Sequence, residues 1–254
     1  MALKRIIPCL LLRDSGLVKT IKFKNSTYIG DPINAVKIFN EKEVDELVFL
    51  DIDATNDRKE PPYQLIHDIA TECFMPFCYG GGIKTIDQIR RLIASGAEKV
   101  AINSEAFYNP QFVQEAAVVF GSSTIVVSID YKKNLFGKQM VYVNGGRKST
   151  KKDPLTYALE MEKLGAGELF LNSIEKDGMM NGYDIDLIKK ISEEVSIPVI
   201  ACGGAGELND FKNAFKEGKA SAVAAGSLFV FQGKKRGVLI SYPDPKEIKE
   251  IIKV

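Results

Sequence analysis

The sequence predicts an α/β fold, a single (β/α)8 (TIM) barrel built from two duplicated half-barrels and spanning residues 1–254 as one domain. Short apolar runs alternate with amphipathic stretches eight times, which is the pattern of such a barrel. The same sequence pattern occurs twice at a constant offset, since Leu47 and Leu169 lie 122 residues apart, as do Gly81 and Gly203. An open doubly wound sheet is the alternative, and the half-repeat disfavours it because a four-plus-four duplication closes naturally.

The expected strands are apolar runs rich in Val, Ile and Leu that do not alternate with polar residues. This pattern is typical of parallel strands that are covered on both faces. In chain order the runs are Arg5–Leu12, Glu46–Asp51, Pro76–Tyr79, Lys99–Asn103, Thr124–Asp130, Glu168–Asn172, Pro198–Cys202 and Ala222–Ala225.

The stretches between these runs carry helix signals. Ile86, Ile89 and Ile93 keep helical spacing before a stop at Gly96, and Asp31 and Asp184 stand where helices should begin. Two longer loops, at 13–30 and 131–152, interrupt the plan at equivalent places in the two halves, and the second holds an apolar run that predicts a small hairpin at 138–143. Both loops should lie on the face where such barrels keep their active site.

Composition excludes several classes of protein. The net charge of +1 gives no basic field for nucleic acid. The apolar run Ile6–Leu12 is too short to cross a bilayer and is better explained as a buried first strand, so we expect no membrane association. The cysteines show no CxxC spacing and are expected to be reduced core thiols in the cytoplasm rather than metal ligands or disulfides: Cys9, Cys73, Cys78 and Cys202.

The single histidine limits the chemistry further. His67 falls in a helix-like stretch, where a surface position is expected. Because the only histidine is expected on a helix surface, we expect no His-dependent triad and no metal cluster built within this chain, and hence no metal, no cofactor and no internal glutaminase.

Residues at the carboxyl ends of barrel strands carry the chemistry in this fold. Asp130 and Asp51 each end an apolar run, where a carboxylate can act as acid or base at the mouth, or can instead cap the following loop. Asp177 follows the sixth run and is either a turn-former ahead of Gly178 or a direct ligand contact.

The paired glycines predict two anion sites. Gly-Gly turns place backbone N–H groups near helix starts, where phosphates bind. Each turn is followed by a strand that ends in small polar residues, and the two sets have matched offsets. Two such sites across one mouth imply an elongated ligand with an anion at each end. The expected phosphate-binding residues are Gly82, Asn103 and Ser104 in one half, and Gly204, Gly226 and Ser227 in the other.

The order of motifs along nearly the whole chain resembles the cyclase subunit of imidazole glycerol phosphate synthase, the HisF-like family. The matching segments include KRIIPCL, DELVFLDI, YGGGI, GSSTIVVSID, GAGELFLNSI and IPVIACGGAG. The resemblance implies a lyase-type synthase subunit that takes ammonia from a glutaminase (HisH-like) partner, through the barrel, to a bisphosphorylated substrate. It implies that Asp130 is a catalytic acid/base and that Lys19 lies on a mobile first loop. It also implies a charged ammonia gate at the barrel floor, formed by Arg5, Glu46, Lys99 and Glu168, which could otherwise be surface ion pairs.

The sequence departs from the family pattern at the mouth. Family members have an aspartate where Leu11 stands, 119 residues before Asp130, and a threonine at the places of Asp53 and Asn172. A leucine cannot transfer a proton, and one acid/base group is worth about 10²–10⁴ in rate. The catalytic position at Leu11 is therefore lost, which should cripple ordinary cyclisation.

This combination resembles a divergent branch associated with sugar amidation for bacterial surface polysaccharides such as lipopolysaccharide O-antigen. There the barrel serves a glutaminase-like partner and a separate sugar amidotransferase that acts on a nucleotide-linked sugar. Two alternatives stay open. One is a genuine cyclase subunit of histidine biosynthesis with an altered acid, and the other is a non-catalytic ammonia conduit or docking subunit.

Overall fold

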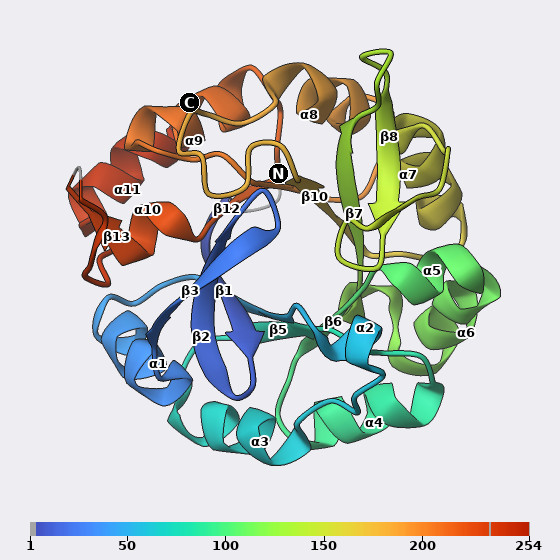
Figure 1. Ribbon diagram of the computed structural model, residues 1–254, viewed down its shortest axis with the longest axis horizontal. Helices are drawn as coiled ribbons and strands as arrows, with labels where there is room; N and C mark the ends of the chain where they lie inside the picture. The colour runs from blue at the N-terminus through green and yellow to red at the C-terminus, as the bar shows by residue number, and fades with distance from the viewer. Residues whose placement is uncertain (1–3, 234, 254) are drawn as a thin grey trace.

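The computed structural model describes residues 4–233 and 235–253, and its centre is a closed barrel of eight parallel strands (Figure 1). Each strand pairs with the next around the circle, and the β10–β7 and β1–β12 pairings close it. The prediction of a (β/α)8 barrel is confirmed, and every expected strand is present with its ends shifted by three residues or fewer. The barrel strands are β1 (Arg5–Arg13), β4 (Leu47–Asp51), β5 (Phe77–Gly80), β6 (Lys99–Ile102), β7 (Ile125–Lys133), β10 (Glu168–Ser173), β11 (Val199–Cys202) and β12 (Ala222–Ala225).

Helices surround the barrel, and their starts follow the signals in the sequence. Asp31 accepts a hydrogen bond from the Asn34 amide at 3.0 Å and Pro32 fills the first helical position, so α1 is capped as expected. The outer helices are α1 (Pro32–Glu41), α3 (Tyr63–Glu72), α4 (Ile86–Ala94), α6 (Gln111–Phe120), α7 (Pro154–Lys163), α8 (Ile185–Ser192), α9 (Leu208–Lys216) and α11 (Pro245–Ile252). Shorter elements are α2 (Ala54–Asp57), α5 (Ser104–Tyr108), the 3-10 turn η1 (Ser122–Thr124) and α10 (Ser227–Val230).

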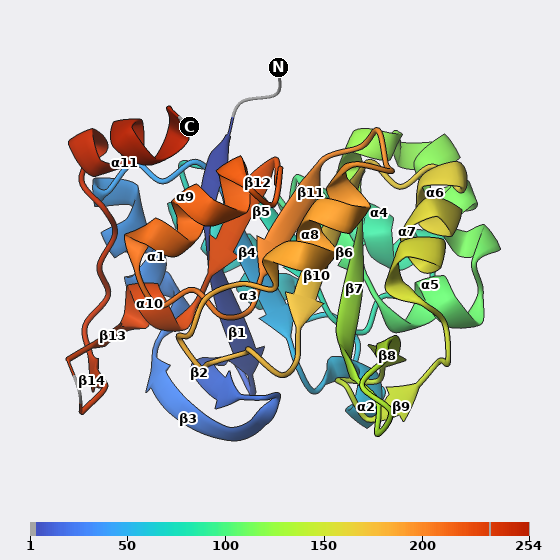
Figure 2. The same ribbon diagram turned by 90° about the horizontal axis from the view of Figure 1, so that it is seen from above.

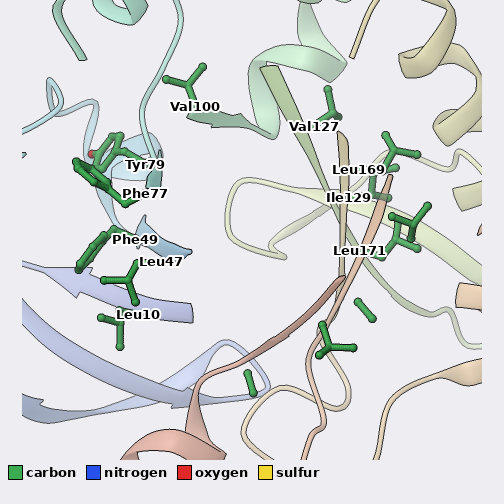
Figure 3. Close-up of a cluster of buried hydrophobic side chains, with 14 of the residues drawn as sticks. Leu10, Leu47, Phe49, Phe77, Tyr79, Val100, Val127, Ile129, Leu169 and Leu171 are labelled. Carbon is green, nitrogen blue, oxygen red and sulfur yellow. The ribbon is translucent and has the colours of Figure 1, made fainter. Parts of the chain in front are cut away.

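Alternate side chains of each barrel strand point to opposite faces of the sheet and belong to two different hydrophobic cores. One set packs between the strands and the helices, and part of it is shown in Figure 3 with Leu47, Phe49, Val127 and Ile129 among its members. The other set fills the barrel interior with small and branched residues, including Val48, Cys78, Ala101, Val126 and Ile200, and with the aromatic ring of Phe170. Side chains at Leu11 and Asp130 follow the inward alternation, so both point into the barrel.

Both segments expected as long loops contain antiparallel strands. Residues 13–30 form a hairpin of β2 (Gly16–Ile21) and β3 (Lys24–Gly30), and the expected loop is in this respect wrong. The hairpin expected at 138–143 is confirmed as β8 (Gln139–Val143), which pairs with the extended end of β7 and with β9 (Lys148–Ser149). A third small hairpin joins β13 (Phe231–Gln232) and β14 (Gly237–Val238). Figure 2 shows these hairpins at one end of the barrel, with α11 at the other.

The two halves repeat each other in detail. β1 and β7 are each followed by a hairpin, and β6 and β12 are each followed by a short helix, α5 or α10. The strand register agrees with the repeat, because Leu11 pairs with Leu50 in the first half and Asp130 pairs with Asn172 in the second. Leu50 and Asn172, 122 residues apart, therefore hold equivalent register positions, as do Leu11 and Asp130, 119 residues apart.

The remaining expectations concern single residues and membrane spans. His67 is exposed on α3, as predicted for a helix surface. Cys9, Cys78 and Cys202 are buried core thiols, and Cys73 is half-buried. In the described part of the chain no helix has the length and hydropathy to cross a membrane.

Candidate active site at the barrel mouth

A cavity of about 500 Å³ opens at the carboxyl ends of the barrel strands. All eight strands contribute to its wall, and the hairpin β2–β3 lies over part of its opening (Figure 1). Most of the predicted site residues line it: Leu11, Lys19, Asp51, Gly82, Asn103, Ser104, Asp130, Asp177, Gly204, Gly226 and Ser227. The cavity is therefore the candidate site, and the four predicted gate residues lie at the other end of the barrel.

Asp130 is a buried carboxyl group inside this cavity, with 8% of its surface exposed. Burial raises its pKa from 3.8 to about 7, and the nearby charge of Asp177 adds to the rise. The Ser128 hydroxyl donates a hydrogen bond to it at 3.4 Å, which opposes the rise. A carboxyl with a pKa near neutrality is suited to give and take protons.

The equivalent wall of the first half is apolar. Leu11 is 8% exposed and points inward at the place that Asp130 occupies in the second half. Its register partner Leu50 stands where the second half has Asn172. The mouth is consequently asymmetric, with a polar pair, Asp130 and Asn172, in one half and an aliphatic pair, Leu11 and Leu50, in the other.

Asp51 caps the loop that follows its strand. Its Oδ1 accepts hydrogen bonds from the amides of Asp53 and Ala54 at 3.2 and 3.1 Å, at the start of α2. Burial raises its pKa while these two amides lower it. The capping interpretation thus describes its contacts, although the side chain also lines the cavity.

Lys19 lies in strand β2 and reaches into the barrel. Only 5% of Lys19 is exposed, and its Nζ donates a hydrogen bond to the Cys9 carbonyl. The ammonium lies against Gly226, since a Cβ added to that glycine would be 2.0 Å from Nζ. Burial lowers the pKa of this ammonium, and the neighbouring Cys9 and Asp177 oppose that change. Lys19 lies in the expected segment after β1, but in a strand that pairs with β3 rather than in an irregular loop, and the mobility of this segment stays a prediction.

Asp177 ties this hairpin to the loop after β10. Its Oδ2 accepts hydrogen bonds from the Thr20 hydroxyl at 2.7 Å and the Phe23 amide at 3.1 Å, and its carbonyl accepts from the Lys22 amide at 2.9 Å. Lys22 and Phe23 both have positive φ, which hairpin turns require but which these residues seldom adopt. The hydrogen bonds to Asp177 therefore hold a strained turn in place. Burial raises the pKa of the Asp177 carboxyl.

The two predicted anion cradles lie on opposite sides of the cavity, since three strands lie between β6 and β12 in either direction around the circle. Gly82 and Gly204 have φ of +70° and +122°, and a Cβ on Gly204 would approach the Gly182 carbonyl to 2.2 Å, so the turns need glycine. Asn103 precedes α5, where its Nδ2 donates to the Ser128 carbonyl at 2.9 Å, and Gly226 precedes α10. Phosphate binding at these turns stays a prediction.

Four charges close the floor of the barrel in an alternating ring. Arg5 pairs with Glu46 and with Glu168, the latter at 2.8 Å, and Lys99 lies 3.2 Å from both glutamates. Three of them begin their strands and Glu46 directly precedes β4, so all four face the axis at the same end. Burial raises the pKa of Glu46, and both cations oppose that rise.

One polar contact at the mouth was missed by sequence reasoning. Arg13, at the end of β1, donates from Nε and Nη2 to the carboxylate of Asp53 at 2.5 and 3.1 Å, and also to the Ser26 hydroxyl. The contact holds β1, β3 and the loop after β4 together. The charge at Asp53, noted as a departure from the family, was the available signal.

Comparison with known proteins agrees with this geometry. The family model described as "Histidine biosynthesis protein" matches residues 5–235. A Pseudomonas aeruginosa protein provisionally named imidazole glycerol phosphate synthase subunit hisF2 is 52% identical over 248 residues, 98% of this chain and 99% of that protein. Imidazole glycerol phosphate synthase subunits HisF from a Hydrogenobaculum species and from Streptococcus sanguinis are 47% and 42% identical, over 91% and 89% of this chain and 92% and 90% of theirs. The chain therefore belongs to the histidine biosynthesis protein family, among the HisF-like subunits of imidazole glycerol phosphate synthase.

Proposed function

We propose that this barrel takes ammonia from a glutaminase (HisH-like) partner at its floor and releases it at its mouth for the amidation of a nucleotide-linked sugar, in bacterial surface-polysaccharide synthesis. The observation that carries the proposal is the asymmetry of the mouth, where Leu11 and Leu50 replace the polar pair of the other half. The floor ring, in contrast, has all four of its charges.

The floor supports the import of ammonia. Paired charges that are this buried cost desolvation energy, and removing one partner leaves an uncompensated charge. A ring that can exchange partners around the barrel axis can open and close a path for a small neutral molecule. The interior above it is lined by apolar side chains such as Val48, Ala101 and Val126, which cannot trap ammonia by protonation. The word "subunit" in the relatives' names also fits a barrel that works with a partner.

The mouth supports a change of reaction. Ordinary cyclisation in the family uses two carboxylates, and this site offers only Asp130 on the inward faces of β1 and β7. The missing group corresponds to about 10²–10⁴ in rate. The paired glycine turns still suit a ligand with phosphates, either a bisphosphorylated molecule or the diphosphate of a nucleotide sugar.

Two other functions keep specific support. The HisF names of the relatives favour a genuine cyclase of histidine biosynthesis. The apolar half of the mouth favours a conduit that makes no bond itself and passes ammonia to a docked sugar amidotransferase.

The experiment is a reconstitution with amide-¹⁵N-glutamine, the glutaminase partner, this barrel and the sugar amidotransferase. We expect ¹⁵N in the nucleotide sugar by mass spectrometry, with transfer dependent on the barrel. Transfer from glutamine that is equally fast without the barrel would contradict the proposal, as would label found in an imidazole product.

A further inference from the structure

A buried acceptor without a partner faces the interior of the mouth. Asn172, on β10, is 6% exposed, and its Oδ1 has no hydrogen-bond partner within residues 4–233 and 235–253. The residue lines the cavity and points inward beside Asp130. A buried polar atom that loses water without gaining a partner destabilises the folded protein, so a group that fills the gap is expected to be a ligand.

The surroundings place further acceptor oxygens beside this one. Ser128 and Asp130 lie two residues apart on the same face of β7, and neighbouring strands are about 4.8 Å apart. The Ser128 hydroxyl already donates to Asp130, so its lone pairs remain available. The thiol of Cys202, the other register neighbour of Asn172, interacts with Cys9. A ligand that contacts these oxygens together satisfies them by donating several hydrogen bonds.

The shape and charge of the place restrict the ligand further. The opposite wall is formed by Leu11 and Leu50, which offer no hydrogen bond. The Lys19 ammonium is held at the Cys9 carbonyl and Gly226 instead. Ammonia has three N–H donors and one lone pair, and ammonium has four donors, so either satisfies a set of acceptors next to a carboxylate.

We propose that Asn172, Asp130 and Ser128 form a binding site for the ammonia nitrogen at the top of the barrel interior. This rests on the proposed function, because it places the nitrogen where transfer would occur. Ammonia donates N–H bonds to the three oxygens, and its lone pair stays free for the electrophile in the cavity. When ammonium enters from solvent, one N–H bond breaks, the proton goes to the Asp130 carboxylate, and its electron pair stays on nitrogen as ammonia.

Rubidium tests the site without any transfer reaction, because Rb⁺ resembles ammonium in charge and size. Crystals of the isolated barrel soaked in rubidium chloride at pH 8 should show an anomalous peak in contact with Asn172 Oδ1 and Asp130. The isosteric variant Asn172→Leu should lose that peak. A wild-type crystal with rubidium bound elsewhere and none at this place would overturn the proposal, whatever the fate of the amidation assay.

Thermal stability separates a ligand site from a structural role. Asn172→Leu removes an unsatisfied atom, so its Tm should equal or exceed the wild-type value. The matched control Asn103→Leu removes a real hydrogen bond to the Ser128 carbonyl and should lower Tm. If the Tm of Asn172→Leu falls as far as the Tm of Asn103→Leu, the Asn172 amide has a structural role and the site is refuted.

Kinetics complete the test in the reconstituted system. With ammonium salts as the nitrogen source, Asn172→Leu should raise KM for ammonium roughly 10- to 100-fold, the effect of one lost hydrogen bond to a charged or polar ligand. The effect on kcat at saturating ammonium should be smaller. An unchanged KM would count against the site, whereas absence of all transfer by the wild-type protein would refute the proposed function and leave the rubidium result standing.

Discussion

Replacing the buried carboxyl at the mouth should stabilise the protein in a pH-dependent way. Asp130 has a pKa of about 7 in the folded protein, above its ordinary value of 3.8. The folded state therefore holds an extra proton between about pH 4 and pH 7, and stability contributed by this group falls as pH rises through that window. Asp130→Asn keeps the shape and removes the ionisation, so it should remove this loss.

The size of this stability loss follows from the difference between the two pKa values of Asp130. The gap from 3.8 to about 7 spans about three pH units, each worth about 1.4 kcal/mol, which gives a ceiling of about 4 kcal/mol above pH 8. Urea unfolding from pH 4 to pH 9 measures it as the difference between Asp130→Asn and wild type. We expect a difference near zero at pH 4 that grows to a few kcal/mol by pH 8. The exposed control Asp186→Asn should show only a small difference throughout. A constant or shrinking difference for Asp130→Asn would refute the claim that burial raises the pKa of this carboxyl.

Other substitutions test the remaining contacts. Leu11→Asp should raise ordinary cyclisation, by at most about 10²–10⁴, in a turnover assay with ammonium, and no gain would show that the mouth no longer fits that substrate. Lys99→Gln leaves two glutamates with one cation, so it should destabilise the barrel by about 3 kcal/mol in urea unfolding. It should also slow glutamine-dependent transfer more than ammonia-dependent transfer, and equal slowing of the two would show that the ring has only a structural role. Asp177→Ala should speed hydrogen exchange of the Phe23 amide, while Asp177→Asn, which keeps an acceptor, should change it less; identical exchange would mean that the contact does not hold the turn. Gly226→Ala should displace the Lys19 ammonium and lower Tm, because the added Cβ meets Nζ at 2.0 Å and the Cys9 carbonyl at 2.8 Å; an unchanged Tm would contradict this packing.

The barrel strands could be predicted because each is buried on both faces. Runs such as Leu47–Asp51 and Val199–Cys202 have no polar alternation, and glycine turns end several of them at matched offsets. Strand ends then fixed which residues face the mouth, so Asp130 and both glycine turns were placed correctly from sequence alone.

The hairpin over the mouth could not be predicted, for a physical reason. Its turn uses Lys22 and Phe23 at positive φ, without the Asn-Gly or Gly pair that identifies such turns in a sequence. Asp177, some 150 residues away, holds this turn by hydrogen bonds that no local pattern reveals. The same limit applies to Asn172, whose missing partner is a property of the folded cavity.

The most direct test of the account is turnover of the bisphosphorylated histidine-pathway intermediate by the purified wild-type barrel with ammonium as the nitrogen source. The HisF subunit of Hydrogenobaculum, 47% identical to this chain, serves as the positive control. With Leu11 in place of a carboxylate, we predict turnover lower than that control by about 10²–10⁴. Turnover comparable to the control would contradict the account and identify the protein as an ordinary cyclase of histidine biosynthesis.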